Sequence, residues 1–581
     1  MFKPLWGVLA GALALSSLLV RPAQARDLEL LEVYEVAASM ISRQNPLFLF
    51  PGLQADRMTV NGNGGEYHVT INGLGLPGST ATVPEPVVVR LPRSTNDGDL
   101  IEVIVEGLPT STIMPGGQSL KLIEPRFTGY WSVSRRGFER FELSVDSVRF
   151  QGAGIAYSAR GIEASLGQER GRHVMRFIAK EFNANYGDSF TGSERAKGLE
   201  IELSAPVETF SADVLVAIGY RISGLAFNET EVQEVLAPNP PQADSLNGLE
   251  IKLEFEGESW EQIVPPSKGA LKKVAATIQV DESAGNGLSK VLIDASIGSI
   301  TQTLEQMDFR VQRPSTFTMV LDGVESRSLA DLLLDRSEGF DEPEIGESLS
   351  FQASVDVGKV AVIVPDVDLD FGAKSLAGSL SSEADGDGNQ TLVMQGTAEQ
   401  IEVVNWLNRD QLEPFASKII APGMPAKTQI ELALEGLSSA DVQKMVTAAL
   451  ALDLGGVAGA LPSDLSGLTV VLQNSFYKSK LVEAEWSGRL KPRRGRIPVQ
   501  GDFKLVTGQL APMQIGMQQS IGTPVPAVSQ AMSAGILGLT LLQTFAVRED
   551  GGKLLFDIEF PEEGGLPLVN GRPLPFQQFL R

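Results

Sequence analysis

Cysteine is absent from all 581 residues, and this absence excludes several kinds of chemistry at once. Without thiols the chain has no disulfide framework, no thiolate-bound metal, no cysteine nucleophile and no lipidated cysteine. The hydrophobic content of 43% is large enough for extensive cores. We therefore expect a folded protein that is stabilised by apolar burial instead of covalent cross-links.

Histidine and positive charge are also scarce. His68 and His173 are the two histidines, and each lies within a strand-like segment, so the sequence does not favour a zinc site or a Ser-His-Asp triad. With 48 basic and 72 acidic residues, the net charge is −24, and such a surface repels nucleic acid. We predict no catalytic residue, no metal site, no cofactor and no nucleic-acid partner.

Two segments match the spacing of known motifs without their structural context. Residues 73–78 fit the glycine pattern of dinucleotide-binding loops, but the helix that this motif requires does not follow. Residues 385–389 space oxygen ligands as a calcium loop does, but Gln390 stands where that loop needs glycine. Both segments are expected to be turns.

The N-terminus has the composition of a secretory signal. Lys3 precedes the apolar residues 5–20, and Ala23-Gln-Ala25 is a small-residue cleavage site. We predict a signal peptide over residues 1–25 with cleavage after Ala25, the alternative being a retained membrane anchor. Export without disulfides favours the periplasm of a Gram-negative bacterium.

The length predicts two or more domains. Residues 237–244 contain three prolines, which disfavour regular pairing and make this segment the best linker. We expect an N-terminal β-rich domain over residues 26–236 and a C-terminal β-rich domain over residues 246–581.

Two segments, residues 317–334 and 429–445, share one pattern of a strand, a glycine and a helix. Apolar residues alternate along each strand, so Met319 and Leu321, for example, face one side. Gly323 and Gly436 follow at the point where positive φ lets the chain turn. Serines 326, 328, 438 and 439 are then candidates to cap the helices.

No charged residue occurs between Lys504 and Arg548. Apolar residues recur there at helical spacing, and we predict helices over residues 509–543 and, earlier in the chain, over residues 439–452. Burial on a sheet face is the leading interpretation of the uncharged segment. The alternatives are a transmembrane span, which several prolines interrupt, and the wall of a groove for an acyl chain.

The expected fold class is mainly β (α+β), with large antiparallel twisted sheets, short strand-glycine-helix units and C-terminal helices packed on a sheet face. The signal sequence, the repeated units, the helical stretch 509–543 and the closing segments 553–558 and 568–574 resemble an exported alphaproteobacterial family of unknown function (the domain of unknown function 2125 type). They are similar, more distantly, to the YdgA-like family. These families resemble the large β-groove envelope proteins of the AsmA type, which implies a role with lipids.

Three functions remain open at this point. The leading hypothesis is a non-enzymatic envelope protein whose apolar groove binds a lipid or an apolar protein segment. The second is a scaffold that binds envelope proteins through its sheet edges, and the third is a hydrolase that uses carboxylates. The sequence leaves the oligomeric state open. The residues predicted to line the groove are Val442, Met445, Val446, Val525, Val528, Met532, Ile536 and Leu539.

Overall fold

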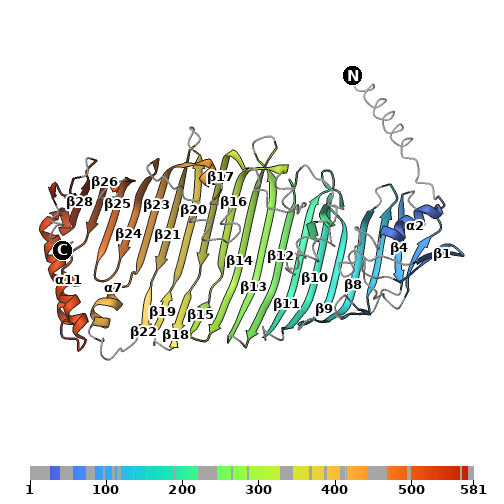
Figure 1. Ribbon diagram of the computed structural model, residues 1–581, viewed down its shortest axis with the longest axis horizontal. Coiled ribbons are helices and arrows are strands. Elements are labelled where there is room, and N and C mark those ends of the chain that lie inside the picture. Colours follow the sequence, from blue (N-terminus) through green and yellow to red (C-terminus); the bar gives the residue numbers. More distant parts are fainter. Residues whose placement is uncertain are drawn as a thin grey trace, which may run out of the picture. The chain divides into compact units, whose positions relative to one another are not determined.

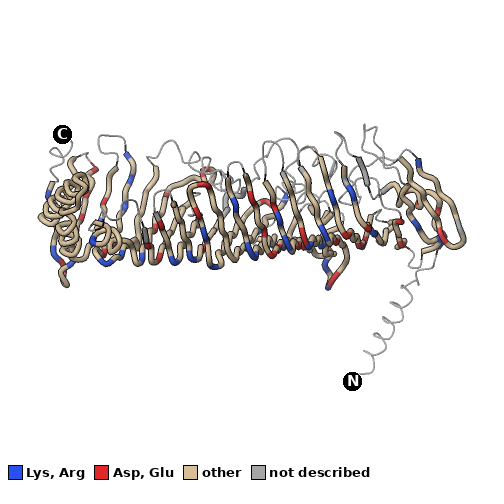
Figure 2. Tube along the Cα trace, turned by 90° about the horizontal axis from the view of Figure 1, so that it is seen from below, with Lys and Arg blue, Asp and Glu red and all other residues tan. Residues whose placement is uncertain are grey.

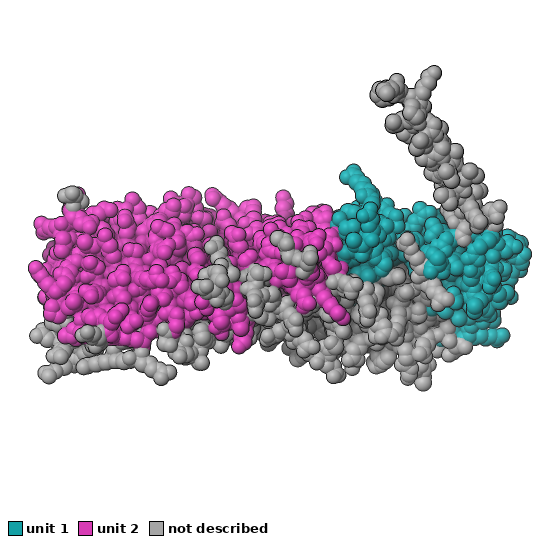
Figure 3. Space-filling model, turned by 90° about the horizontal axis from the view of Figure 1, so that it is seen from above, with its two compact units in different colours: residues 1–189, 197–243, 333–335 teal, residues 190–196, 244–332, 336–581 magenta. Residues whose placement is uncertain are grey.

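The fold is mainly antiparallel β, with helices near the C-terminus, as the sequence predicts (Figure 1). The chain divides into two compact units, which Figure 3 colours separately. Unit 1 contains residues 1–189, 197–243 and 333–335, and unit 2 contains residues 190–196, 244–332 and 336–581. The computed structural model describes residues 26–39, 57–73, 86–95, 99–106, 111–113, 119–134, 137–152, 155–186, 192–212, 214–216, 218–219, 245–263, 266–283, 287–327, 345–365, 369–384, 389–405, 413, 415–442, 444, 467–493, 499–562 and 565–573.

Unit 1 is an antiparallel meander with one short side branch. Each main strand pairs with the next one in the following order: β1 (Arg57–Asn63), β2 (Glu66–Asn72), β3 (Val87–Pro92), β4 (Leu100–Glu106), β7 (Arg126–Ser132), β8 (Gly137–Gly152), β9 (Ile155–Glu169) and β10 (Arg172–Tyr186). The branch is β5 (Ser111–Ile113) and β6 (Ser119–Ile123), which pairs with β8. Strand β11 (Gly192–Pro206) belongs to unit 1 from residue 197 onward.

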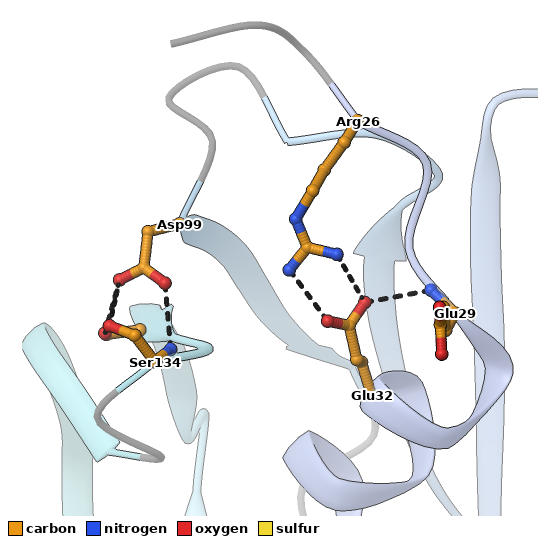
Figure 4. A network of polar contacts seen from close by, with 6 residues as sticks. Arg26, Glu29, Glu32, Asp99 and Ser134 are labelled. Atoms are coloured by element: carbon orange, nitrogen blue, oxygen red, sulfur yellow. Dashed lines mark hydrogen bonds and ion pairs between the residues drawn. The ribbon is translucent and has the colours of Figure 1, made fainter.

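Helix α2 (Leu30–Ser39) begins unit 1 and packs on β2 through a buried face that contains Val33 and Val36. Figure 4 shows how its first turn is tied to the preceding chain: Arg26 donates two hydrogen bonds, of 3.0 and 2.7 Å, to the carboxylate of Glu32. The same carboxylate accepts a 2.9 Å hydrogen bond from the backbone N–H of Glu29.

Nearby, Asp99 accepts hydrogen bonds from the hydroxyls of Ser132 and Ser134 and from the backbone N–H of Ser134, at 2.6, 2.9 and 2.8 Å (Figure 4). Burial raises the pKa of Asp99, but these hydrogen bonds outweigh it, so the pKa lies below its usual value. The network holds Asp99, directly before β4, against the end of β7.

Unit 2 is a longer antiparallel meander. Each main strand pairs with the next: β12 (Glu250–Gln262), β13 (Ser267–Glu282), β14 (Leu288–Leu304), β16 (Ser315–Glu325), β17 (Ile345–Val357), β20 (Ser375–Ala384), β21 (Asn389–Glu399), β23 (Lys427–Ser438), β24 (Thr469–Lys478), β25 (Glu483–Pro492), β26 (Val499–Thr507) and β28 (Leu554–Phe560). A branch from β14 runs through β15 (Met307–Val311), β18 (Val360–Val364), β19 (Leu369–Ala373) and β22 (Glu402–Asn405). Short strands β27 (Val547–Arg548), β29 (Leu568–Val569) and β30 (Arg572–Pro573) complete the C-terminal edge.

The two strand-glycine-helix units have the predicted glycine conformation. Gly323 has a φ of 95° and Gly436 a φ of 86°. The pairing register shifts beside each glycine, so each one forms a β-bulge, and the strand ends two residues later. Helical residues follow at 326–327 and 439–442. Ser438 caps the second helix, because its hydroxyl accepts a 3.2 Å hydrogen bond from the backbone N–H of Asp441.

The predicted helical stretch 509–543 forms two helices, α10 (Ala511–Ser520) and α11 (Pro526–Phe545), which pack on each other. The short η3 (Ala416–Ile420) lies beside α10, and α7 (Ala421–Gly423) follows η3 and contacts it. Turn η5 (Asp550–Gly552) precedes β28. None of the helices in the described residues has both the length and the apolar character that crossing a membrane requires.

Candidate functional site

The sheet of unit 2 carries a line of apolar side chains across its strands, which only Gly488 interrupts. Residues that lie directly opposite each other in antiparallel strands place their side chains on the same face. The register connects twelve such residues, one from each main strand, and we name this line the apolar row. Its members are Ile251, Ile278, Ile293, Met319, Ala353, Leu380, Met394, Leu432, Leu472, Gly488, Phe503 and Ile558.

The apolar row is not a buried core. Ile251 is buried on the first strand, whereas the other eleven members are all partly exposed. Unit 1 has a comparable line of paired residues, but there the side chains are closed off from water: Val69, Val89, Val105, Phe127, Leu143 and Ala164 are at most 6% exposed. The partial exposure in unit 2 is therefore a property of that sheet and does not follow from the strand pattern.

The neighbouring line on the same face is more exposed. It contains Phe317, Val355 and Ile430, whose exposed fractions are 38%, 40% and 50%. Between Val355 and Ile430 the paired positions are Gly378 and Gly396. These two glycines leave a gap in the layer of side chains, bordered in the apolar row by Leu380 and Met394. A Cβ added to Gly396 would meet no heavy atom within 4 Å, which shows that the gap is open.

On the opposite face of the same strands, the residues directly behind the apolar row are polar. Successive side chains in a strand point to opposite faces, so the residues next to the apolar row belong to the other side. The register connects nine of them, which we name the polar row: Lys252, Thr277, Asp294, Thr318, Ser354, Ser379, Gln395, Glu431 and Gln473. Along this line, the sheet therefore has apolar residues on one face and polar residues on the other.

Helix α11 covers the part of the apolar face that is formed by the last strands of unit 2. Leu539 and Phe545 pack on a buried cluster that includes Phe556 of β28, a residue on the same face as Ile558. Figure 1 shows α11 lying beside the last strands of unit 2. The side-chain amide of Asn570 fastens this contact, because it donates hydrogen bonds of 2.7 and 2.9 Å to the backbone carbonyls of Phe545 and Leu555.

The residues predicted to line a groove occupy different surroundings. Val442 is fully buried behind the second bulge, and Met445 and Val446 lie outside the described residues. Val525, the residue before α11, and the helix residues Val528, Met532, Ile536 and Leu539 are all partly buried. Leu539 contacts the cluster on the apolar face, and the ligand-binding role of all eight remains a prediction.

Sequence reasoning missed most of the apolar row. Period-two alternation did place Met319 beside Leu321 and Leu432 beside Leu434 on one face of their strands, but alternation within a strand does not identify partners in other strands. The register supplies that information, and it is set by the bulges and hairpins over the whole unit. Glycines 378 and 396 carry no sequence signal that would distinguish them from turn glycines.

Unit 2 also contains a pair of acidic side chains in contact. Glu258 of β12 and Glu194 of β11 share a side-chain hydrogen bond. Burial, with the neighbouring carboxyl of Glu194, raises the pKa of Glu258 to about 7. A direct hydrogen bond holds two carboxyls closer than the roughly 5–9.5 Å that separates the acids of glycosidases, so the pair is arranged to share a proton and does not enclose a sugar bond.

In the residues that the structure describes, the two histidines lie apart from other groups that could form a catalytic or metal centre with them. His173 is buried within β10, and Nε2 of His68 lies 3.7 Å from the carboxylate of Glu66 on an exposed part of β2. In the part of the chain that the structure describes, no three histidine or acidic side chains group as metal ligands do. The apolar face of unit 2 is consequently the most distinctive candidate site.

Comparison with known proteins finds no relative of this chain: no family model matches its sequence, no curated protein matches it, and no solved structure matches its fold.

Proposed function

We propose that the protein is an exported, non-enzymatic envelope protein that binds acyl chains of lipids on the apolar face of unit 2. The observation that carries this proposal is the apolar row, which crosses twelve strands and is partly exposed on eleven of them. Sheets of soluble proteins normally bury such a face against a second layer, and extended exposed apolar surface marks a binding site.

An acyl chain fits this surface better than a protein strand does. The main strands in the middle of unit 2 each pair on both sides, so their backbone N–H and C=O groups are already used and offer no edge that a β-strand could join; they are β14, β16, β17, β20, β21, β23, β24, β25 and β26. Only side-chain contacts remain, and these are apolar and non-directional. Met319 and Met394 add flexible side chains that adapt to ligands of different shape.

The gap at Gly378 and Gly396 supports the same ligand. A space without side chains, walled by Leu380, Met394 and Ile430, can receive a narrow hydrocarbon chain while the backbone forms its floor. The polar row on the other face keeps the sheet soluble around this surface.

Native mass spectrometry of the gently purified full chain tests the proposal, because bound lipid then appears as discrete added masses. We expect these adducts to decrease strongly in the Met394→Glu variant, which puts a charge in the apolar row. The matched control is Gln395→Glu, which puts the same charge on the next residue and hence on the polar face. Equal lipid occupancy in both variants, or unliganded masses in repeated preparations of the natural protein, would contradict the proposal.

Export is a separate part of the proposal. It rests on the signal-like residues 1–25 and on the fact that Arg26, the residue after the expected cleavage site, is held by Glu32 through two hydrogen bonds. Chemical sequencing of the protein from a periplasmic extract should begin at Arg26. A chain that keeps residues 1–25 would instead support a membrane anchor.

A further inference from the structure

Helix α11 has an unusual outer surface for a helix of an acidic protein. None of its 20 residues is charged or fully buried. Figure 2 shows it without a charged residue while the neighbouring strands carry both signs. Leu537, Leu541 and Leu542 are 63%, 40% and 48% exposed, and in the preceding helix Ile515 is 53% exposed.

The hydroxyl groups of α11 donate their hydrogen bonds within the protein. Ser533 donates a 3.0 Å hydrogen bond to the backbone carbonyl of Ser529, and Thr540 donates a 2.8 Å hydrogen bond to that of Ile536. Thr544 and Ser529 likewise donate to backbone carbonyls, of Leu541 and Ile521. All four hydroxyls of the helix are thus satisfied internally, which is how polar residues are tolerated next to hydrocarbon.

The apolar surface is broad. Leu537 and Leu541 are four residues apart and share one side of the helix, whereas Leu542 is turned by about 100° from Leu541. A helix–helix seam needs a narrow stripe, but a helix lying in the boundary layer of a membrane uses a wide one. The breadth therefore favours lipid over a second helix.

The charges at the borders also suit lipid headgroups. Lys418 lies in η3, whose backbone touches α10: a Cβ on Gly516 would come within 2.6 Å of the Lys418 carbonyl oxygen. Arg548 follows the C-terminal end of α11, next to the exposed Glu549. Within the described residues neither Lys418 nor Arg548 forms an ion pair, so both can meet phosphate groups.

From these observations we infer that the α10–α11 hairpin is a membrane-docking element, which lays its uncharged outer surface into the boundary between headgroups and acyl chains. Leu539, which is turned by about 160° from Leu541, packs on the apolar face, and so does Phe545 at the end of the helix. Docking would therefore bring a bilayer to the end of the surface that we propose binds lipid. The docking itself does not depend on that proposed function.

The absence of cysteine in the chain makes a local test possible. The variant Leu537→Cys, labelled at its single thiol with an environment-sensitive fluorophore, should show a blue shift of its emission when vesicles of phosphatidylcholine and phosphatidylethanolamine are added to the full chain. The same label at Gln473, an exposed residue of the polar row, should not respond. Flotation of unlabelled protein should weaken by about tenfold or more in the double variant Leu537→Glu and Leu541→Glu, but not in Gln473→Glu.

The inference is overturned if the label at position 537 does not respond to vesicles. It is also overturned if light scattering shows a dimer that the double variant dissociates, since the surface would then join two copies of the chain. Met394→Glu separates the two proposals: it should lose co-purified lipid yet still float with vesicles. If lipid co-purifies with the natural protein and the double variant floats unchanged, only the docking role fails.

Discussion

Gly396 of β21 lies directly opposite Ile430 of β23, and together they form the open end of the gap in the apolar face. A side chain at position 396 has room, because nothing lies within 4 Å of its Cβ position and the backbone there is not left-handed. The variant Gly396→Leu should therefore fold normally and fill the space that we assign to an acyl chain.

We expect Gly396→Leu to reduce lipid occupancy several-fold in native mass spectrometry, since the gap would be occupied by the protein itself. Gly167→Leu in β9 is the matched control, because a Cβ there also meets nothing within 4 Å but belongs to unit 1. Unchanged occupancy in Gly396→Leu would show that the gap is not where the ligand lies.

The second bulge provides a test of stability. Gly436 has a φ of 86°, and an added Cβ would come within 2.7 Å of the carbonyl oxygen of Gly467. Gly436→Ala should lower the free energy of unfolding of unit 2 by about 1–3 kcal/mol, measured by urea denaturation. Gly467→Ala should have a much smaller effect, since its Cβ meets nothing within 4 Å; equal effects would mean that the bulge is not strained by a side chain.

The contact of Arg26 with Glu32 predicts a stability that is lost in acid. The hydrogen bonds from Arg26 lower the pKa of Glu32 in the folded state. A carboxyl group whose pKa is lower in the folded protein stabilises the fold at pH values above its pKa in the unfolded chain, which is about 4.3. This contribution disappears as the pH falls through the pKa of the folded state. Arg26→Gln should therefore unfold unit 1 at a lower temperature at pH 7 than the natural protein, with the difference shrinking toward pH 3.

Arg126→Gln is the control for this experiment, because Arg126 and Glu124 form a comparable ion pair whose side chains are 75% and 59% exposed. Exposed pairs contribute little, so this variant should match the natural protein at both pH values. A difference between natural and Arg26→Gln protein that persists unchanged at pH 3 would indicate lost packing instead of a lost ion pair.

Glu258 predicts the opposite pH dependence for unit 2. Its pKa is raised to about 7 by burial and by Glu194. When folding raises the pKa of a carboxyl group, its contribution to stability is fully present below the pKa of the unfolded state. This contribution is lost as the pH rises toward the folded-state pKa of about 7. Urea midpoints of unit 2 should accordingly decrease between pH 5 and pH 8, and Glu258→Gln should make this decrease smaller. Glu254→Gln, on the same strand but exposed, should retain the natural slope.

Much of the local structure could be predicted from the sequence, because local rules determine it. The positive φ of Gly323 and Gly436, the cap formed by Ser438 and the two helices between residues 511 and 545 all follow from residue type and spacing. The alignment of Met394 with Leu432 does not, since it depends on how many residues each hairpin and bulge contains. Likewise, helical spacing in α11 predicts an apolar side but not that Leu537 stays exposed while Leu539 packs on the sheet.

The pairing of consecutive strands in unit 2 has a consequence for how such a protein can vary. Neighbouring strands lie about 4.8 Å apart, so twelve of them extend the apolar row over roughly 50 Å, more than the ~30 Å hydrocarbon thickness of a bilayer. Each hairpin contributes two residues to the apolar row, one from each strand. Gain or loss of one hairpin in register would therefore lengthen or shorten the apolar row, while the remaining residues kept their neighbours. The length of the apolar row would then depend only on the number of strands in the sheet.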